Sequence, residues 1–212
     1  MRDFPFFTTQ HGVASVVLKE VPYRGEAYIK IQSALEPAAL LDECAGFCRT
    51  VGAERVYASG HECLAEYPIH TSVLQMCCSR EALGDTDAAL FPVQEITLQK
   101  WRELYNERMA DVDNASYMTE ADGKRMLEAG NGYFVHRNGK LLGIGMASGD
   151  KIDAVISCIP GCGKDVVLAL NHALCGDSVQ LEVASTNKRA IRLYEKLGFL
   201  TVNEISCWYK IF

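Results

Sequence analysis

Residues 179–199 read VQLEVASTNKRAIRLYEKLGF, and this stretch decides how the chain is interpreted. Val179–Ala184 is rich in branched and apolar residues, which is typical of a short strand. The polar run 185–187 follows, and Ser, Thr and Asn side chains cap helices. Apolar residues then recur at helical spacing, namely Ala190, Ile191, Leu193, Tyr194 and Leu197. The stretch therefore predicts a strand that leads into a helix of about three turns, which ends at Gly198.

The run LEVASTNKRAIRLYEKLGF, residues 181–199, resembles the strand–helix signature near the C-terminus of the GNAT superfamily of acyl-CoA-dependent N-acetyltransferases. The order of expected elements over about residues 91–212 is similar to the same family, so the resemblance covers a little over half of the chain. It implies an α/β fold with a mixed sheet, acetyl-CoA as cosubstrate, and transfer of an acetyl group to a primary amine of a small molecule or peptide.

Composition and charge limit the function classes. The chain has 212 residues, of which 49% are hydrophobic and 23% charged, as expected for a folded protein with a real core. The net charge of −6 argues against a general nucleic-acid binder, because such proteins gather Lys and Arg against phosphates. No stretch approaches eighteen apolar residues, and we expect no membrane partner.

Nine cysteines allow either a disulfide framework or a set of reduced thiols. Because nine is odd and the N-terminus lacks a continuous apolar region, we expect reduced thiols and a cytoplasmic protein. Cys44 and Cys48 stand four apart on an expected helix, and His61 and Cys63 follow. No paired CxxC motif with zinc spacing occurs, so we expect no metal.

The first part of the chain contains one β-α-β unit. Strands are expected at residues 13–18, 26–31 and 55–58, with a helix from Pro37 to Gly52. A further apolar run covers 70–78. The turn-forming residues 84–87 indicate the boundary between a first domain, 1–88, and a GNAT acetyltransferase domain, 89–212.

A faint internal repeat joins the two parts. At a spacing of about 126 residues, the helix–strand pair that ends in residues 57–59 matches the pair that ends in 183–185. One interpretation is that the N-terminal part is a degenerate half-copy of the same fold; the other is a chance match of two short patterns. In this register Val56 stands where Glu182 stands and Pro68 where Tyr194 stands, so the first copy lacks the chemistry.

The second part shows a regular order of elements. We expect a strand at Val93–Leu98, a helix at 100–110, a helix from the capping box at 119–122 to Gly130, and a hairpin around Asn138-Gly139. The elements that follow are a strand at 152–159, a helix at 166–174, and the strand and helix of the opening stretch. The short glycine pattern 143–145 lies inside a strand and favours close packing or a bulge.

The loop that follows the strand at 152–159 is the expected cofactor site. The resemblance implies that Cys158, Ile159, Gly161, Cys162, Gly163 and Lys164 contact acetyl-CoA. Backbone N–H groups of a glycine-rich turn at a helix N-terminus suit a pyrophosphate. The loop departs from the family pattern, because Cys158 stands where the family usually has Arg or Gln. Asp165 either repels phosphate or caps the helix.

Two residues are the expected catalytic groups. The resemblance implies that Tyr194 is the general acid that protonates the departing thiolate, and that Glu182 is the general base that acts through water. Without the resemblance, the sequence indicates that Tyr194 is a packed helix residue and that Glu182 is a charged strand residue that needs a partner. Asn187 resembles a family residue that touches the cofactor, and it also suits a helix cap.

Two other function classes stay open. One is a domain that has kept the fold, with or without CoA binding, but not the transfer activity. The other is a thiol enzyme that uses Cys162, which lies between two glycines at a helix N-terminus. The acceptor would be recognised by about residues 100–130, where four acids favour either a cationic acceptor or a solvated surface, namely Asp111, Asp113, Glu120 and Asp122.

Overall fold

The structure is a computed structural model that describes residues 5–212. The chain forms two compact units. The first unit runs to Val73 and also includes Ile205–Phe212, whereas the second unit comprises Leu74–Glu204. The strands β5 (Ile69–Ser79) and β11 (Leu200–Lys210) therefore contribute residues to both units.

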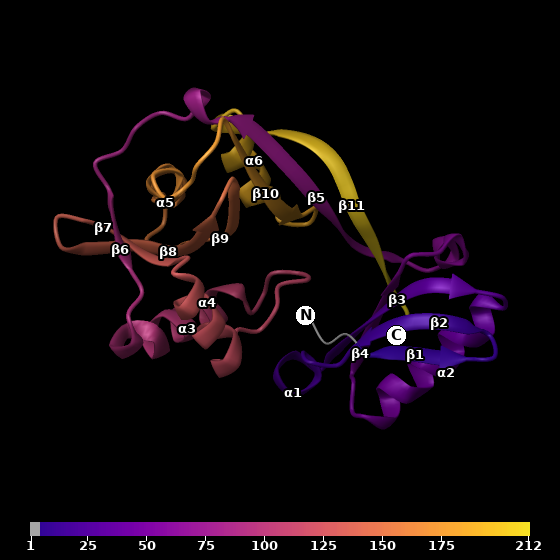
Figure 1. The fold of residues 1–212 in the computed structure, drawn as a ribbon. Coiled ribbons are helices and arrows are strands. Elements are labelled where there is room, and N and C mark those ends of the chain that lie inside the picture. Colours follow the sequence, from indigo (N-terminus) through magenta and orange to yellow (C-terminus); the bar gives the residue numbers. More distant parts are fainter. Residues whose placement is uncertain (1–4) are drawn as a thin grey trace. The chain divides into compact units, whose positions relative to one another are not determined.

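The first unit packs one long helix on a sheet. Its strands follow the order β1-β2-β3-β4-β11, in which β1, β2 and β3 are antiparallel neighbours and β3 and β4 run parallel. The crossover helix α2 packs along this sheet (Figure 1). It buries Leu40, Leu41 and Cys44 there. The elements are β1 Phe6–Thr9, β2 Gly12–Val17, α1 Val21–Arg24, β3 Glu26–Ala34, α2 Pro37–Thr50, β4 Arg55–Ser59 and the short 3-10 helix η1 Glu62–Glu66.

The second unit is a mixed sheet with the strand order β5-β10-β9-β8-β7-β6. The strands β6 to β9 are antiparallel neighbours. The strands β9 and β10 pair in parallel, and the helix α5 connects them in the chain. The elements are η2 Arg80–Ala82, β6 Ala89–Pro92, α3 Glu95–Met109, α4 Glu120–Ala129, β7 Gly132–Arg137, β8 Lys140–Ser148, β9 Lys151–Ser157, α5 Gly163–Asn171, β10 Ser178–Ala184 and α6 Lys188–Lys196.

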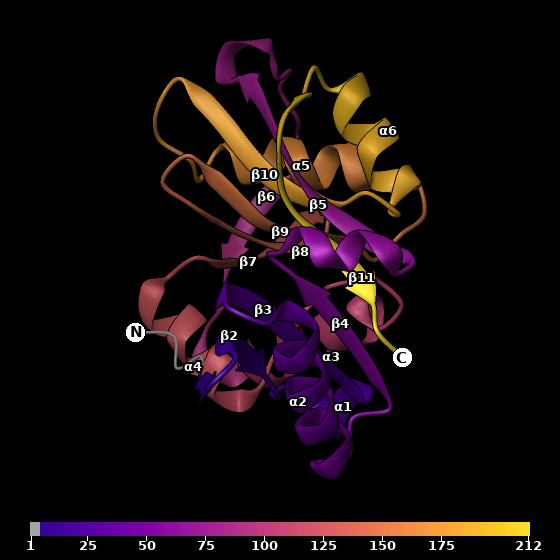
Figure 2. The same cartoon turned by 90° about the vertical axis from the view of Figure 1, so that its right-hand side faces the viewer.

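Helices cover both faces of this second sheet. The helices α5 and α6 share one core with β10, as Figure 2 shows from the side, whereas α3 and α4 pack on the opposite face around the fully buried Trp101. Two glycines of β8 let α5 approach closely, since a Cβ on Gly143 would lie 2.6 Å from Val166 Cγ2 and one on Gly145 would meet Leu170. The prediction of close packing at 143–145 is thus confirmed.

Three predictions for the second unit that rest on short sequence motifs are confirmed: a capping box, a tight turn and a helix start. Thr119 and Asp122 form the expected capping box, and Gly130 ends α4 in the left-handed conformation. Asn138 and Gly139 both have positive φ, as the tight turn between β7 and β8 requires. The helix predicted after residue 187 runs from Lys188 to Lys196.

One predicted strand is wrong. The branched residues of Val93–Leu98 favour a strand, but only Ala89–Pro92 pairs with β7, and α3 begins at Glu95. The Gln94 side chain accepts from the backbone N–H of Thr97, and the Thr97 side chain accepts from the backbone of Gln94. This reciprocal cap starts a helix and outweighs the strand preference of the branched residues.

The two units repeat the same succession of elements. Each has a hairpin, an antiparallel third strand, a crossover helix and a parallel fourth strand, followed by a helical segment. At the spacing of about 126 residues, the first residue of α2, Pro37, corresponds to the first residue of α5, Gly163. The pair Glu26↔Arg55 corresponds in the same way to Ile152↔Leu181. This shared register supports the half-copy interpretation over a chance match.

The compact units divide the chain at Val73, and the turn at 84–87 lies inside the second unit. The division into domains 1–88 and 89–212 stays a prediction about domain organisation. In the described part of the chain, no helix has the length and apolar character needed to cross a membrane.

Candidate active site

The strands β9 and β10 separate shortly after they meet. They pair at Lys151↔Gln180 and Ile152↔Leu181 only, although β9 continues to Ser157 and β10 to Ala184. In the first unit, the corresponding strands β3 and β4 stay paired over five consecutive positions. The facing backbone N–H and C=O groups beyond Ile152 and Leu181 are therefore not paired with each other, and an extended ligand can add to them like a strand.

A bulge in β9 marks the point of separation. Met146 and Ala147 are consecutive residues of β8, and they pair with Ala154 and Ile152 of β9. Asp153, between those two partners, is therefore an extra residue in β9. The side chain of Ile152 packs in the core with α5, whereas that of Ala154 packs in the core with α3. A bulge bends a strand and raises its twist, which turns β9 away from β10 at this point.

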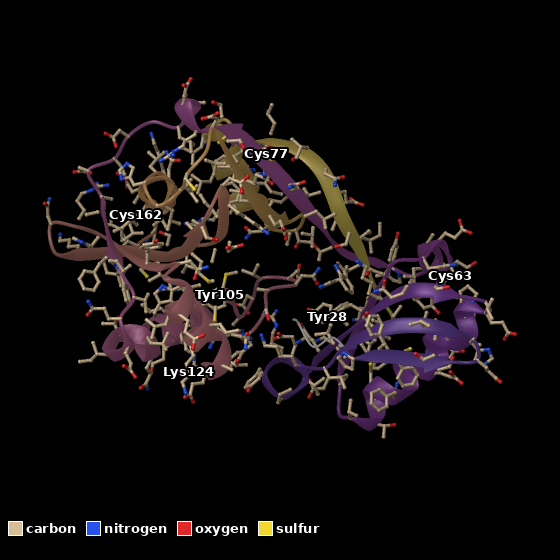
Figure 3. The ribbon with its side chains drawn as sticks, viewed as in Figure 1. Tyr28, Cys63, Cys77, Tyr105, Lys124 and Cys162 are labelled. Carbon is tan, nitrogen blue, oxygen red and sulfur yellow. The ribbon has the colours of Figure 1, made fainter. Side chains whose placement is uncertain are left out.

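The expected cofactor loop connects β9 to α5. Cys158 N–H donates to Leu142 O at 2.8 Å, and Gly161 adopts a positive φ of 90°. Cys162 precedes the first helical residue and lies beside the start of α5 (Figure 3). Within residues 5–212, the N–H groups of Gly161 and of the first three residues of α5 donate to no backbone carbonyl. Free N–H groups at a helix N-terminus attract anions.

The side chains of this loop have mixed roles. Ile159 is 37% exposed, and Cys162 packs partly against the core shared by α5 and α6. The Asp165 carboxylate lies 2.6 Å from the Arg137 guanidinium and accepts a hydrogen bond from Thr86 Oγ1. Arg137 therefore offsets the negative charge that Asp165 would present to a phosphate. Lys164, which is exposed, is the loop's own cation.

Tyr194 lies in the core of the second unit. Its ring is 7% exposed and packs against Phe199, with ring centroids 5.8 Å apart. Burial raises the pKa of Tyr194 to about 12. The phenol is therefore protonated at neutral pH, as a general acid requires, although the ring also serves as a packing residue.

Glu182 lies on the other face of β10. Leu181 and Val183 point into the core that contains Tyr194, so alternation directs Glu182 away from it. Its carboxylate is 43% exposed and lies 2.6 Å from the ammonium of Lys151, which is itself 3.7 Å from Asp153. The structure thus gives Glu182 a partner and separates it from Tyr194 by the thickness of the strand.

Lys151 and Asp153 lie beside Glu182 and are candidate site residues that the sequence analysis missed. They flank Ile152, the last residue of β9 that pairs with β10, and Asp153 is the bulged residue. The available signal was the alternation of charged and apolar residues in Lys151-Ile152-Asp153, which is unusual for an interior strand. Asp153 adds a second carboxylate near Glu182.

Asn187 has the capping role that its position allowed. Its Oδ1 accepts a hydrogen bond from Ala190 N–H at 3.1 Å at the start of α6. The preceding residue, Thr186, donates through Oγ1 to Asp113 Oδ2 at 2.6 Å, which connects the loop after α3 to the end of β10. The role of Asn187 toward a cofactor stays a prediction.

The acids near α4 are engaged locally. Glu120 lies 2.8 Å from Lys124, and Asp122 caps α4 and pairs with Arg125. These contacts favour a structural role for both carboxylates over direct binding of a cationic acceptor.

The thiols Cys44 and Cys48 and the pair His61 and Cys63 have local structural roles. Cys44 and Cys48 lie on the buried face of α2, and burial raises their pKa values to about 12 and about 11. The Nδ1 atom of His61 accepts from Cys63 N–H. Among the residues that the structure describes, no group of three or more His, Cys, Asp or Glu side chains is arranged to hold a metal.

Comparison with known proteins shows similarity in structure alone. No protein-family model and no curated protein matches the chain. A GCN5-related N-acetyltransferase from Anabaena variabilis superposes with a TM-score of 0.61 at 12% identity, over 94% of this chain and 59% of that protein. A functionally unknown conserved protein from Staphylococcus epidermidis gives a TM-score of 0.58 at 12% identity, over 99% of this chain and 94% of that one.

A tandem GNAT protein from the clavulanic acid biosynthesis pathway gives a TM-score of 0.50 at 10% identity, over 94% of this chain and 78% of that protein. The similarity therefore extends well beyond residues 91–212, to which the sequence signature alone pointed. The repeated succession of elements, the separated parallel strands and these superpositions agree, and the chain has the fold of the GNAT acetyltransferases.

Proposed function

We propose that this protein is an N-acetyltransferase that moves an acetyl group from acetyl-CoA to a primary amine of a small molecule or peptide. The observation that carries the proposal is the separation of β9 from β10 after Ile152 and Leu181. It leaves two unpaired strand edges beside a helix N-terminus with free N–H groups. The first unit, where β3 and β4 stay paired, offers no such gap.

The residues present fit the two ends of such a cosubstrate. The amides of a pantetheine arm can pair with the backbone of β9 beyond Ile152, as an added strand does. The pyrophosphate fits the N–H groups of Gly161 and of the first turn of α5, with Lys164 as a nearby cation. Arg137 offsets the charge of Asp165 in that turn.

The reaction needs a base, an oxyanion site and an acid. The amine must be neutral before its nitrogen attacks the thioester carbonyl and forms the new C–N bond. Collapse of the tetrahedral oxyanion breaks the C–S bond and releases a thiolate. Tyr194 then donates its proton to the thiolate and regains one from solvent; its raised pKa of about 12 ensures that the phenol is protonated at neutral pH when the thiolate forms.

Glu182 is the proposed acceptor of the amine proton, through water. Its carboxylate is 43% exposed, so water can reach it, and it lies 2.6 Å from the ammonium of Lys151. The Asp153 carboxylate lies 3.7 Å from the same Lys151 ammonium, so a second carboxylate is present at the point where the strands separate. Loss of Glu182 alone therefore has a smaller effect than loss of both carboxylates.

A binding domain without transfer activity is the second candidate. It is favoured by the burial of Tyr194 in a packing role and by the loop, where Cys158 replaces the Arg or Gln expected from the resemblance. Such a domain would bind CoA and acetylate no amine.

A screen of primary amines with acetyl-CoA separates the two candidates. Release of free thiol above the hydrolysis background, with the acetylated amine identified by mass spectrometry, supports the transferase. Tight binding of acetyl-CoA without any acetylated product across small amines and peptides supports the binding domain.

A further inference from the structure

The outer face of α6 carries a basic hollow. Arg189, Arg192, Leu193 and Lys196 line a space of ≈ 330 Å³. The three cationic side chains are exposed, and none of them forms an ion pair within residues 5–212. Because the whole chain has a net charge of −6, three unpaired cations around one hollow form a local positive field that favours an anion.

The hollow borders the expected cofactor loop. Leu193 Cδ2 would lie 2.9 Å from a Cβ placed on Gly163, the first residue of α5. A side chain that lines the hollow therefore contacts the turn whose N–H groups are free. A ligand anchored at the N-terminus of α5 is thus next to the basic hollow.

The loop supplies little charge of its own. Lys164, in the first turn of α5, is the one cation in the segment from Cys158 to Asp165, and Asp165 is already paired with Arg137. A pyrophosphate and a further phosphate on the same ligand carry more negative charge than one Lys offsets. Backbone N–H groups solvate a phosphate, but they do not neutralise it.

We infer that the hollow formed by Arg189, Arg192 and Lys196 holds the 3′-phosphate of the acyl-CoA, so that α6 supplies the cations that the loop lacks. The inference rests on the proposed function and deepens it. Arg is suited to this role because its planar guanidinium binds phosphate oxygens through two parallel hydrogen bonds. The protein then selects CoA thioesters over thioesters of dephospho-CoA or pantetheine.

The test compares CoA with dephospho-CoA, which differ only in the 3′-phosphate. Calorimetric titration of the full-length protein gives the two dissociation constants for the unchanged protein and for the double variant Arg189→Gln/Arg192→Gln. We expect the unchanged protein to bind CoA about 10-fold or more tightly than dephospho-CoA. The double variant is expected to bind both ligands with the weaker affinity, and its preference falls to about 1.

A matched control removes two charges elsewhere. The double variant Lys30→Gln/Lys140→Gln changes net charge equally, on β3 of the first unit and at the first residue of β8, and it should keep the preference for CoA. Equal binding of CoA and dephospho-CoA by the unchanged protein would overturn the inference and leave the proposed function intact. Retention of the full preference by Arg189→Gln/Arg192→Gln would overturn it in the same way. If neither ligand binds the unchanged protein, the proposed function fails together with the inference.

Discussion

Ile152 and Leu181 form the last backbone pair between β9 and β10, and the strands separate directly after them. The corresponding pair of the first unit, Glu26 and Arg55, is instead the first of five consecutive pairs. The two parallel strands therefore separate in the second unit, whereas the corresponding strands of the first unit stay paired. Of these two corresponding strand pairs, β9 and β10 are the pair that leaves backbone groups for a ligand that binds by strand addition, which agrees with the absence from the first copy of residues equivalent to Glu182 and Tyr194.

Replacement of Tyr194 by Phe tests the general acid. The ring packs against Phe199 in a core, and Phe preserves that packing. We expect turnover to fall about 100-fold, because the thiolate loses its proton donor, while the affinity for acetyl-CoA stays nearly constant. Steady-state kinetics with a saturating amine measures both quantities. Turnover equal to that of the unchanged enzyme would remove Tyr194 from the mechanism.

Replacement of Gly145 by Ala tests the close contact between β8 and α5. A Cβ at this position would lie 2.7 Å from Ala154 O and would also meet Leu170. Because the backbone oxygen cannot move aside, we expect a loss of about 1–3 kcal/mol in the free energy of unfolding. Urea denaturation measures it. Gly84→Ala is the control, since nothing lies within 4 Å of its Cβ, and it should leave the free energy nearly unchanged.

Replacement of Asn106 by Ala tests whether the loop between α3 and α4 positions the acceptor. Asn106 Oδ1 accepts from Met118 N–H at 2.8 Å, and its Nδ2 donates to Met118 O at 3.1 Å. Loss of both bonds releases the loop, so we expect KM for the amine to rise several-fold more than KM for acetyl-CoA. Gln99→Ala, on the exposed face of the same helix, should change neither. Equal changes in the two KM values would argue against this role.

Alkaline pH should destabilise the first unit through its buried thiols. Burial raises the pKa of Cys44 to about 12 and that of Cys48 to about 11, whereas an exposed thiol titrates near 8.5. The stabilising contribution is full below the pKa of the unfolded chain and is lost as pH rises toward the folded values. We expect the free energy of unfolding to fall by about 1–2 kcal/mol per thiol between pH 8 and 10.5.

The double variant Cys44→Ala/Cys48→Ala checks the source of that loss. It should show a smaller decrease over the same pH range than the unchanged protein, as measured by urea denaturation. Cys175→Ala removes an exposed thiol and serves as the control. An identical decrease in all three proteins would show that other groups cause the alkaline loss of stability.

Features set by local interactions could be predicted from the sequence. The cap at Asn187, the capping box at Thr119 and the turn at Asn138-Gly139 each depend on residues within four positions. The strand predicted at Val93–Leu98 failed because the hydrogen bonds between Gln94 and Thr97 were not recognised as a helix start. The type of a short segment is decided by such caps as much as by side-chain preference.

Features set by long-range pairing could not be predicted. The repeat gave a hint of the shared architecture, but nothing in the composition of β9 and β10 shows that they separate after two pairs while β3 and β4 do not. The ion pair between Lys151 and Glu182 also joins residues that are distant in sequence. Strand register and cross-strand pairs depend on the folded sheet as a whole.

Binding of acetyl-CoA to the purified full-length protein is the most direct test of the central claim. The account predicts a dissociation constant in the micromolar range by calorimetric titration, since the open edges of β9 and β10 and the first turn of α5 would hold the two ends of the ligand. No heat of binding at millimolar acetyl-CoA would contradict it, and the fold would then have been kept without its cosubstrate.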